Sequence, residues 1–250
     1  MNRLRSVLVL VVIVIVAGTC IRLGLWQLER YRERAAANRQ LAAALAAPAR
    51  PLPADGGSTL PPDTLRLGRW QASGRFDETR QVVLVGRTMA GAPGVHIVTP
   101  LLRDEGGPAV LVDRGFVPSP DAATAAPAEF PEPGPRAVIG LVDPLRSRPG
   151  DPLWHRVADD SLAPWSARWL DPDSVAATFP YAVAPIVLRQ LPGEDVPTRP
   201  ARTAAQFAGT VVHLSYAGQW FFFALITILG PFALGRSRRK RPPPEPRDRS

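Results

Sequence analysis

The sequence predicts a two-pass α-helical membrane protein with an extracytoplasmic α+β domain, whose antiparallel sheet is curled as a small barrel or sandwich. Three observations predict this fold. An apolar segment lies near each end of the 250-residue chain, and each is long enough to cross a bilayer as a helix. A strongly basic segment follows the second apolar one, as is typical of a cytoplasmic membrane flank. Short β-type runs, separated by turn residues, lie between the two.

The first apolar segment is predicted to be a transmembrane helix over residues 7–26. Val7 to Ile21 carries no charge, and the run continues past Arg22 to Trp26. About 20 helical residues cross the hydrocarbon core, which places Trp26 at the far interface, where tryptophan is enriched. The alternative is a cleaved signal peptide, or a lipoprotein signal at Cys20. Threonine directly before this cysteine fits a lipoprotein signal poorly, so we expect the helix to stay attached.

The second apolar segment, residues 207–235, contains no Asp, Glu, Lys or Arg and is predicted to be the second transmembrane helix. The basic, proline-rich residues 236–250 follow it. Near the two segments, basic residues are more numerous on the side of the termini than on the side of the loop, and such residues tend to remain in the cytoplasm. We therefore expect residues 1–6 and 236–250 to be cytoplasmic, in a protein of the plasma membrane. The flanks of the first segment alone favour the reverse orientation.

Residues 27–206 are predicted to form the extracytoplasmic, β-rich domain. Charged residues after Trp26 continue the first helix to about Leu45, and the proline- and glycine-rich residues 48–62 and 119–135 are predicted to be flexible loops. The β-type runs that we expect to form strands are residues 64–71, 81–85, 96–102, 110–117, 137–142 and 182–188.

A helix-capping sequence and two glycines give local predictions within this domain. Asp171-Pro172-Asp173-Ser174, followed by Val175 to Phe179, predicts a short capped helix with proline in its first turn. Gly74 and Gly115 each stand beside an aromatic or charged residue at an expected turn or bulge. Since glycine is the residue that most easily adopts a positive φ, both are expected to matter for folding.

Composition and motifs exclude several function classes. The single cysteine, Cys20, excludes an intramolecular disulfide and a Cys-x-x-Cys pair. The net charge of +8 is concentrated beside an apolar segment and not in a nucleic-acid-binding motif, so no nucleic-acid partner is expected. Nucleophile elbows, phosphate-binding glycine loops and zinc signatures are absent from the sequence, and we expect no enzyme. His96, within a predicted strand, is interpreted as structural and His155 as a solvated loop residue.

His213 is the one ionisable side chain at the outer end of the second apolar segment, and ionisable residues within membrane segments are functional candidates. Counting back about 20 residues from Arg236 places His213 at the outer interface. Tyr216 and Trp220 follow at i+3 and i+7, on the same face of the helix. An imidazole with aromatic planes beside it suits a haem edge. The alternative is an interfacial aromatic belt that includes a polar histidine.

Several motifs, in order along the chain, resemble the Surfeit locus assembly-factor family. The element Gly24-Leu25-Trp26-Gln27-Leu28-Glu29-Arg30 is similar to the family's Gly-x-Trp-Gln-x-x-Arg pattern. The other elements that carry the resemblance are Gly74-Arg75-Phe76-Asp77, Gly94 with Val98-Thr99-Pro100-Leu101, Val110 to Pro118, and His213 to Phe221. One departure is Val211, which stands where the family commonly has asparagine.

The resemblance implies a non-catalytic chaperone for the assembly of a haem-copper terminal oxidase, cytochrome c oxidase, as part of respiratory chain assembly. The implied partners are the lipid bilayer and an oxidase subunit, most directly the one that carries haem. The implied cofactor is haem, with haem a the form proposed for some members, and His213 corresponds to the proposed ligand of the haem iron. The residues expected to contact haem are His213, Tyr216, Trp220, Trp26 and Arg30. A structural scaffold that binds an oxidase subunit without touching haem is the alternative.

Overall fold

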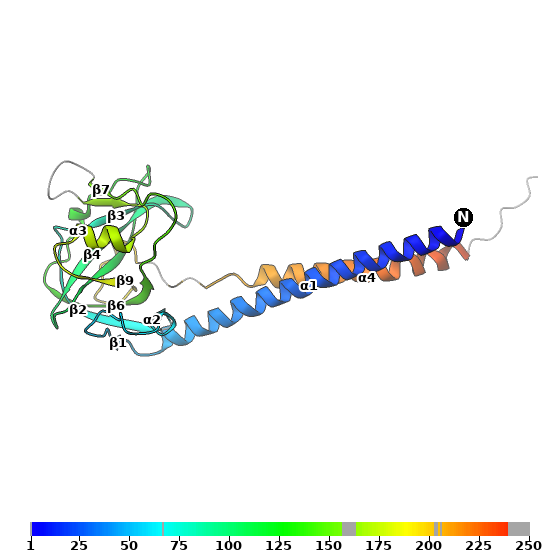
Figure 1. The fold of residues 1–250 in the computed structure, drawn as a ribbon, viewed down its shortest axis with the longest axis horizontal. Helices are drawn as coiled ribbons and strands as arrows, with labels where there is room; N and C mark the ends of the chain where they lie inside the picture. Colours follow the sequence, from blue (N-terminus) through cyan, green and yellow to red (C-terminus); the bar gives the residue numbers. More distant parts are fainter. Residues whose placement is uncertain (1, 67, 157–163, 203–204, 206, 240–250) are drawn as a thin grey trace, which may run out of the picture. The chain divides into compact units, whose positions relative to one another are not determined.

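The computed structural model describes residues 2–66, 68–156, 164–202, 205 and 207–239 (Figure 1). The chain divides into two compact units. One comprises residues 1–39 and 207–250, and the other comprises residues 40–206.

Two long helices build the first unit, and the end of the first helix, from residue 40 on, belongs to the second unit. Helix α1 spans Asn2–Ala46 and helix α4 spans Val211–Arg239. Among the described residues these two are long and apolar enough to cross a membrane, with a mean hydropathy of 2.7 for α1 and 1.5 for α4 over their most apolar windows. Pro231 lies inside α4. The predicted span of residues 7–26 therefore lies within a helix that continues without a break into the charged residues that follow it.

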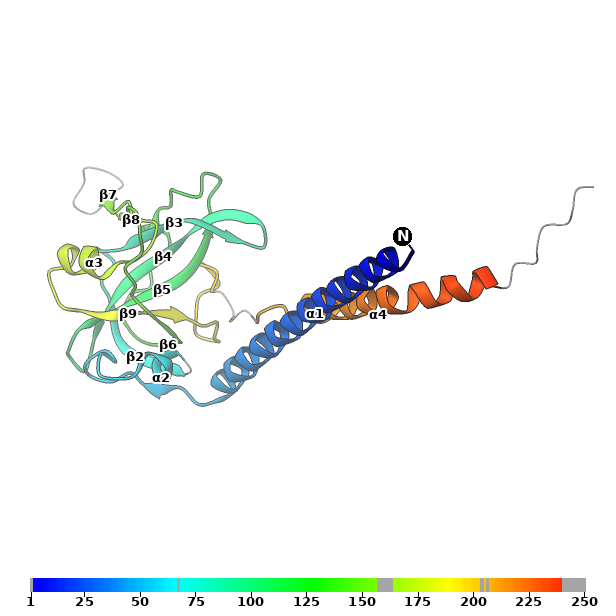
Figure 2. The ribbon, with the colours of Figure 1, turned by 45° about the vertical axis from the view of Figure 1, so that its right-hand side comes forward.

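Small side chains line the contact between α1 and α4, which run side by side in Figures 1 and 2. Ala17 and Cys20 of α1 and Ala217 and Ala224 of α4 are buried, whereas most large apolar residues of both helices are exposed. A Cβ atom on Gly24 would lie only 2.7 Å from the ring of Phe221. Small residues at a contact of this kind are common between membrane helices.

A closed five-stranded barrel forms the core of the second unit (Figure 2). The ring runs β2–β6–β9–β5–β4 and closes because β4 also pairs with β2. The bounds of these strands are β2 Arg69–Phe76, β4 Ala92–Arg103, β5 Ala109–Pro118, β6 Pro135–Pro144 and β9 Val183–Gln190. Of the two predicted architectures, barrel and sandwich, the structure shows the barrel.

The expectation of a purely antiparallel sheet is wrong, because β5 and β9 pair in parallel. The reason is geometric: strand directions cannot alternate all the way around a ring of five, so at least one neighbouring pair must be parallel. Outside the ring, β3 Val82–Met89 extends from β4, and the short strands β8 Trp165–Ala167 and β7 His155–Arg156 follow it. The two-residue strand β1 Arg50–Pro51 pairs with β2. These three short strands were not predicted.

Helix α2, Pro62–Arg66, replaces the first half of the strand predicted over residues 64–71. Leu65 is buried in the core, and its carbonyl oxygen accepts a hydrogen bond of 2.8 Å from the indole Nε1 of Trp70. This contact requires the chain to turn between the two residues, so the strand begins only at Arg69. The other predicted strands are found, most of them a few residues longer than expected.

The predicted capped helix is confirmed as α3, Pro172–Thr178. The Asp171 carboxylate accepts a hydrogen bond of 3.0 Å from the backbone N–H of Ser174 and so satisfies one free donor of the first turn. A 3-10 helix, η1 Pro127–Glu129, lies within residues 119–135. The flexibility predicted for residues 48–62 and 119–135 stays a prediction, but parts of both segments make defined contacts.

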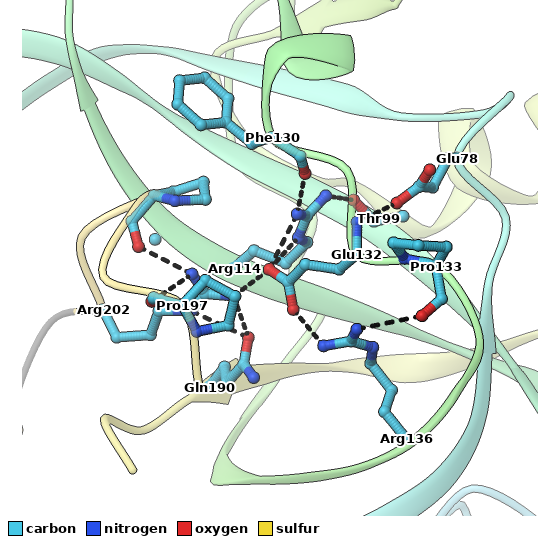
Figure 3. A network of polar contacts seen from close by, with 12 residues as sticks. Glu78, Thr99, Arg114, Phe130, Glu132, Pro133, Arg136, Gln190, Pro197 and Arg202 are labelled. Atoms are coloured by element: carbon cyan, nitrogen blue, oxygen red, sulfur yellow. Dashed lines mark hydrogen bonds and ion pairs between the residues drawn. The ribbon is translucent and has the colours of Figure 1, made fainter. Parts of the chain in front are cut away.

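Glu132, in the second of these segments, is the centre of a buried polar network (Figure 3). Its carboxylate accepts a hydrogen bond of 2.8 Å from Arg114 and contacts the guanidinium groups of Arg136 and Arg202. The side chains of Arg114, Glu132 and Arg202 are almost fully buried. Gln190 of β9 accepts from Arg202 at 3.0 Å. The network joins β5, β6 and β9 to the segment before β6 and to residue 202.

Candidate functional site

His213 lies in the first turn of α4, and its ring contacts α1. The His213 Nδ1 atom is 2.8 Å from the side-chain oxygen Oε1 of Gln27. A carbonyl oxygen can only accept a hydrogen bond, so Nδ1 carries the proton in this contact. In a neutral imidazole the other ring nitrogen, Nε2, then holds the lone pair that can bind a metal. With the amide of Gln27 oriented in this way, the half-buried ring donates through Nδ1 and keeps Nε2 out of this contact.

Gln27 was not among the predicted site residues, although it belongs to the motif that carries the resemblance. The position of the commonly found asparagine is Val211 in this chain, and the structure supplies a side-chain amide to His213 from the other helix instead. A hydrogen bond to the far nitrogen of a metal-binding histidine orients the ring and raises its basicity. The sequence signal for Gln27 is its place directly after Trp26 in that motif, which does not distinguish it from the polar residues nearby.

Trp26 and Arg30, the predicted site residues on α1, form a pair. The Arg30 guanidinium carbon lies 5.9 Å from the centre of the Trp26 ring. Arg30 also donates a hydrogen bond of 2.9 Å to Glu33, and both of these side chains are more than half exposed. Arg30 is therefore partly neutralised but free to turn toward an anionic group at the surface of the helix.

The two predicted aromatic residues of α4 lie in different surroundings. Tyr216 is 48% exposed. Trp220 packs edge-to-face against Phe223, with ring centres 6.0 Å apart. The structure therefore joins His213 to Gln27 and Trp26 to Arg30, and Trp220 packs within its own helix. A haem-contacting role for these five predicted residues stays a prediction.

The other two histidines, His96 and His155, make hydrogen-bond contacts within the β-rich unit. His96 Nδ1 lies 2.8 Å from an oxygen of Asp113, whose carboxylate also accepts from the backbone N–H of Gly115. His155 Nδ1 lies 2.8 Å from the carbonyl oxygen of Leu153. Within the described part of the chain, no group of three or more His, Cys, Asp or Glu side chains could hold a metal ion. A protein-only metal centre therefore has no candidate there, whereas a single imidazole ligand to a haem iron does.

Comparison with known proteins agrees with the motifs. Residues 14–225 match the family model described as the SURF1 family. The chain belongs to the SURF1 family. The resemblance to the Surfeit locus family is thereby confirmed. The chain is also similar to the mouse (Mus musculus) protein named Surfeit locus protein 1, with 29% identity over 120 residues. That alignment covers 42% of this chain and 38% of the mouse protein.

Proposed function

We propose that this SURF1-family chain is a non-catalytic membrane assembly factor for a haem-copper terminal oxidase, cytochrome c oxidase. The support is membership of a family known generally for oxidase assembly factors, together with two helices long and apolar enough to cross a membrane. In this proposal both termini lie in the cytoplasm, and the barrel lies outside the plasma membrane. The partner is the haem-bearing oxidase subunit.

We further propose that the chain holds haem, with haem a the preferred form, through His213. The observation that carries this step is the 2.8 Å contact between Gln27 and His213, which leaves Nε2 as the nitrogen available to iron. The haem would supply the redox group that the oxidase needs. The chain would supply an axial ligand, the aromatic planes of Trp26, Tyr216 and Trp220, and a cation at Arg30 for a propionate.

A scaffold that binds an oxidase subunit without touching haem is the second candidate. The observations that favour it are the engagement of Trp220 with Phe223 and of Arg30 with Glu33. In this reading the aromatic residues of α4 form an interfacial belt, and the Gln27–His213 hydrogen bond fastens the two helices together.

Haem content separates the two candidates. The full chain would be purified in detergent from haem-replete cells, and its haem-to-protein ratio measured by absorbance. His213→Ala should lose haem while the protein still inserts into the membrane, since alanine suits a helix. His213→Met should keep some haem with a shifted spectrum, because a thioether also binds haem iron. The matched control is His155→Ala, which removes an exposed histidine of the barrel unit.

Gln27→Leu tests the positioning role of the amide. Losing such a partner typically weakens metal affinity by about 10–100-fold, so haem occupancy should fall at limiting haem and recover at excess haem. Trp220→Leu should weaken retention less than His213→Ala, because it removes packing and leaves coordination. Equal haem occupancy in wild type, His213→Ala and Gln27→Leu, at equal protein yield, would reject the ligand proposal and favour the scaffold.

The oxidase partner has its own test. A tagged full chain would be recovered from native membranes, and the proteins that accompany it would be identified by mass spectrometry. Recovery of the haem-bearing oxidase subunit by wild type and by His213→Ala alike would support the scaffold. Recovery by wild type and loss in His213→Ala would support haem-dependent association. Absence of every oxidase subunit would contradict the assembly-factor proposal.

A further inference from the structure

A cavity of about 410 Å³ lies on the barrel unit, and the proposed function leaves it without a role. Its wall comes from α2, the strands β3, β4, β5 and β9, the end of β6 with the segment after it, and the segment after β8. Five arginines line it: Arg66, Arg87, Arg146, Arg148 and Arg189. Its volume falls in the range of sites that bind small molecules, about 300–1,000 Å³.

Positive side chains outnumber negative ones on the wall of this cavity. Two carboxylates, Asp113 and Asp143, lie on the wall. Asp143 pairs with Arg189 at 3.4 Å, and Asp113 contacts His96 and a backbone N–H. Within the described residues, Arg66, Arg87, Arg146 and Arg148 have no carboxylate within ion-pair distance, and of these Arg87 is influenced by the charge of Asp113. Three guanidinium groups around one cavity therefore remain uncompensated.

The pKa of Arg87 is affected by the neighbouring charges of the cavity. Burial lowers the pKa of Arg87, and the charge of Arg148 lowers it further, while Asp113 acts in the opposite direction. Arg87 also donates a hydrogen bond of 2.7 Å to the carbonyl oxygen of Arg168, which fixes its guanidinium group at the wall. The cavity thus holds cations close enough to repel one another, and an anion between them would remove that repulsion.

Two of the arginines without an ion pair, Arg146 and Arg148, lie close together in the sequence. They are two residues apart in the segment that follows β6. Both line the cavity and both are exposed. Guanidinium groups bind phosphate oxygens in bidentate fashion. Trp169 and Leu170 add an apolar part to the same wall, which suits an organic group attached to the phosphate.

We propose that this cavity binds a phosphate monoester dianion, with Arg66, Arg146 and Arg148 as its principal ligands. Three uncompensated cations match a dianion better than a monoanion, and the apolar lining by Trp169 and Leu170 matches an ester better than inorganic phosphate. The chemistry is shared by a free phosphate ester and by the headgroup of a lipid such as phosphatidic acid. The site is independent of His213, because its residues all belong to the barrel unit.

The test uses the full chain in a neutral detergent and titrates two probes, glycerol 1-phosphate and dioctanoyl phosphatidic acid, by calorimetry. The double variant Arg146→Gln/Arg148→Gln should bind the preferred probe at least tenfold more weakly than wild type. The matched control is Arg50→Gln/Arg75→Gln, which removes the same net charge at two exposed arginines of β1 and β2 outside the cavity. This control should change affinity less than twofold.

The outcomes of the two titrations distinguish a free phosphate ester, a lipid headgroup and no phosphate site. Binding of glycerol 1-phosphate with the expected loss identifies a free ester, and binding of the lipid alone with the same loss identifies a headgroup. Arg148→Lys keeps the charge without the bidentate geometry and should recover part of the affinity. Absence of binding for both probes, or an equal loss in the cavity variant and in the control, would overturn the proposal. Circular dichroism of every variant excludes a loss caused by unfolding.

Discussion

Replacing Glu132 by glutamine is the most direct test of what holds the barrel to the segment that precedes β6. The substitution keeps the shape of the side chain and one acceptor oxygen, and it removes the negative charge. The guanidinium groups of Arg114 and Arg202 contact that charge and are themselves almost fully buried (Figure 3). After the change, two buried cations face one another without a counter-charge.

The magnitude follows from this burial. Removing one partner of a buried ion pair costs about 3–5 kcal/mol, because the remaining charge stays buried and unpaired. Glutamine retains one hydrogen bond, so we expect the lower end, about 3 kcal/mol. For a domain of about 150–250 residues each kcal/mol shifts the unfolding midpoint by about 2–4 °C. The expected shift of the melting temperature is therefore about 6–12 °C.

The assay is thermal unfolding of the full chain in detergent, followed by the β-sheet signal in circular dichroism. The matched control is Glu129→Gln, which neutralises an exposed glutamate of the same segment and should shift the midpoint by less than about 2 °C. Equal midpoints for Glu132→Gln and Glu129→Gln at neutral pH would refute the buried-charge reasoning.

The dependence on pH gives a second readout for Glu132. Burial raises the pKa of this carboxyl, but Arg114 and Arg202 outweigh that effect and hold it below the ordinary value of 4.5. A carboxyl whose pKa is depressed in the folded state contributes stability that is complete above its unfolded pKa and is lost as pH falls through the folded pKa. The difference between wild type and Glu132→Gln should therefore be constant above pH 4.5 and shrink below it.

Three further predictions rest on separate contacts. Gly115→Ala should lower the free energy of unfolding, measured by chemical denaturation, by more than about 2 kcal/mol. The reason is that φ of Gly115 is +118° and the new Cβ would lie 2.3 Å from a carbonyl oxygen. The control Gly106→Ala, at φ +76° with open space around it, should lower the free energy clearly less. Asp171→Ala removes the cap of α3 and should lower the unfolding free energy by about 1 kcal/mol, and an unchanged value would contradict the capping role. Cysteine labelling from outside the cell, in a background without the native cysteine, should modify position 58 and spare position 250, and the reverse pattern would reject the proposed orientation.

Much of the fold was predictable because its signals are local. The apolar segments, the cap at Asp171 and most strands of the barrel follow from residue periodicity and turn chemistry, which need only neighbouring residues. Ring closure does not follow from local signals, because the pairing of β2 with β4, which sets Phe76 opposite Leu101, passes over the intervening strand β3. The parallel pair β5–β9 is a consequence of that closure. The strands of two or three residues were missed because they are too short to show alternation.

The candidate site was predictable only in part, for the same physical reason. His213 could be found because a histidine stands out in an apolar segment. Gln27 could not be ranked above its polar neighbours, since its partner is 186 positions away in the chain. The arginines of the barrel cavity are separated in sequence from Arg66 to Arg189, and no local pattern distinguishes them from solvated surface arginines. Only the folded sheet brings their charges to one wall.

The Gln27–His213 contact is hard to explain as a device for pairing helices alone. The same two helices already meet through small residues, and Phe221 packs against Gly24. Apolar contacts of this kind associate helices without placing polar atoms among apolar neighbours. A hydrogen bond between polar side chains adds little to such packing, about 0.6 kcal/mol on average in a measured membrane protein. What it adds instead is a fixed ring orientation, which packing does not require and which the haem ligand proposed at His213 would need. Replacing Gln27 by leucine should therefore leave helix pairing nearly intact and lower haem occupancy at His213, if the proposed ligand role holds.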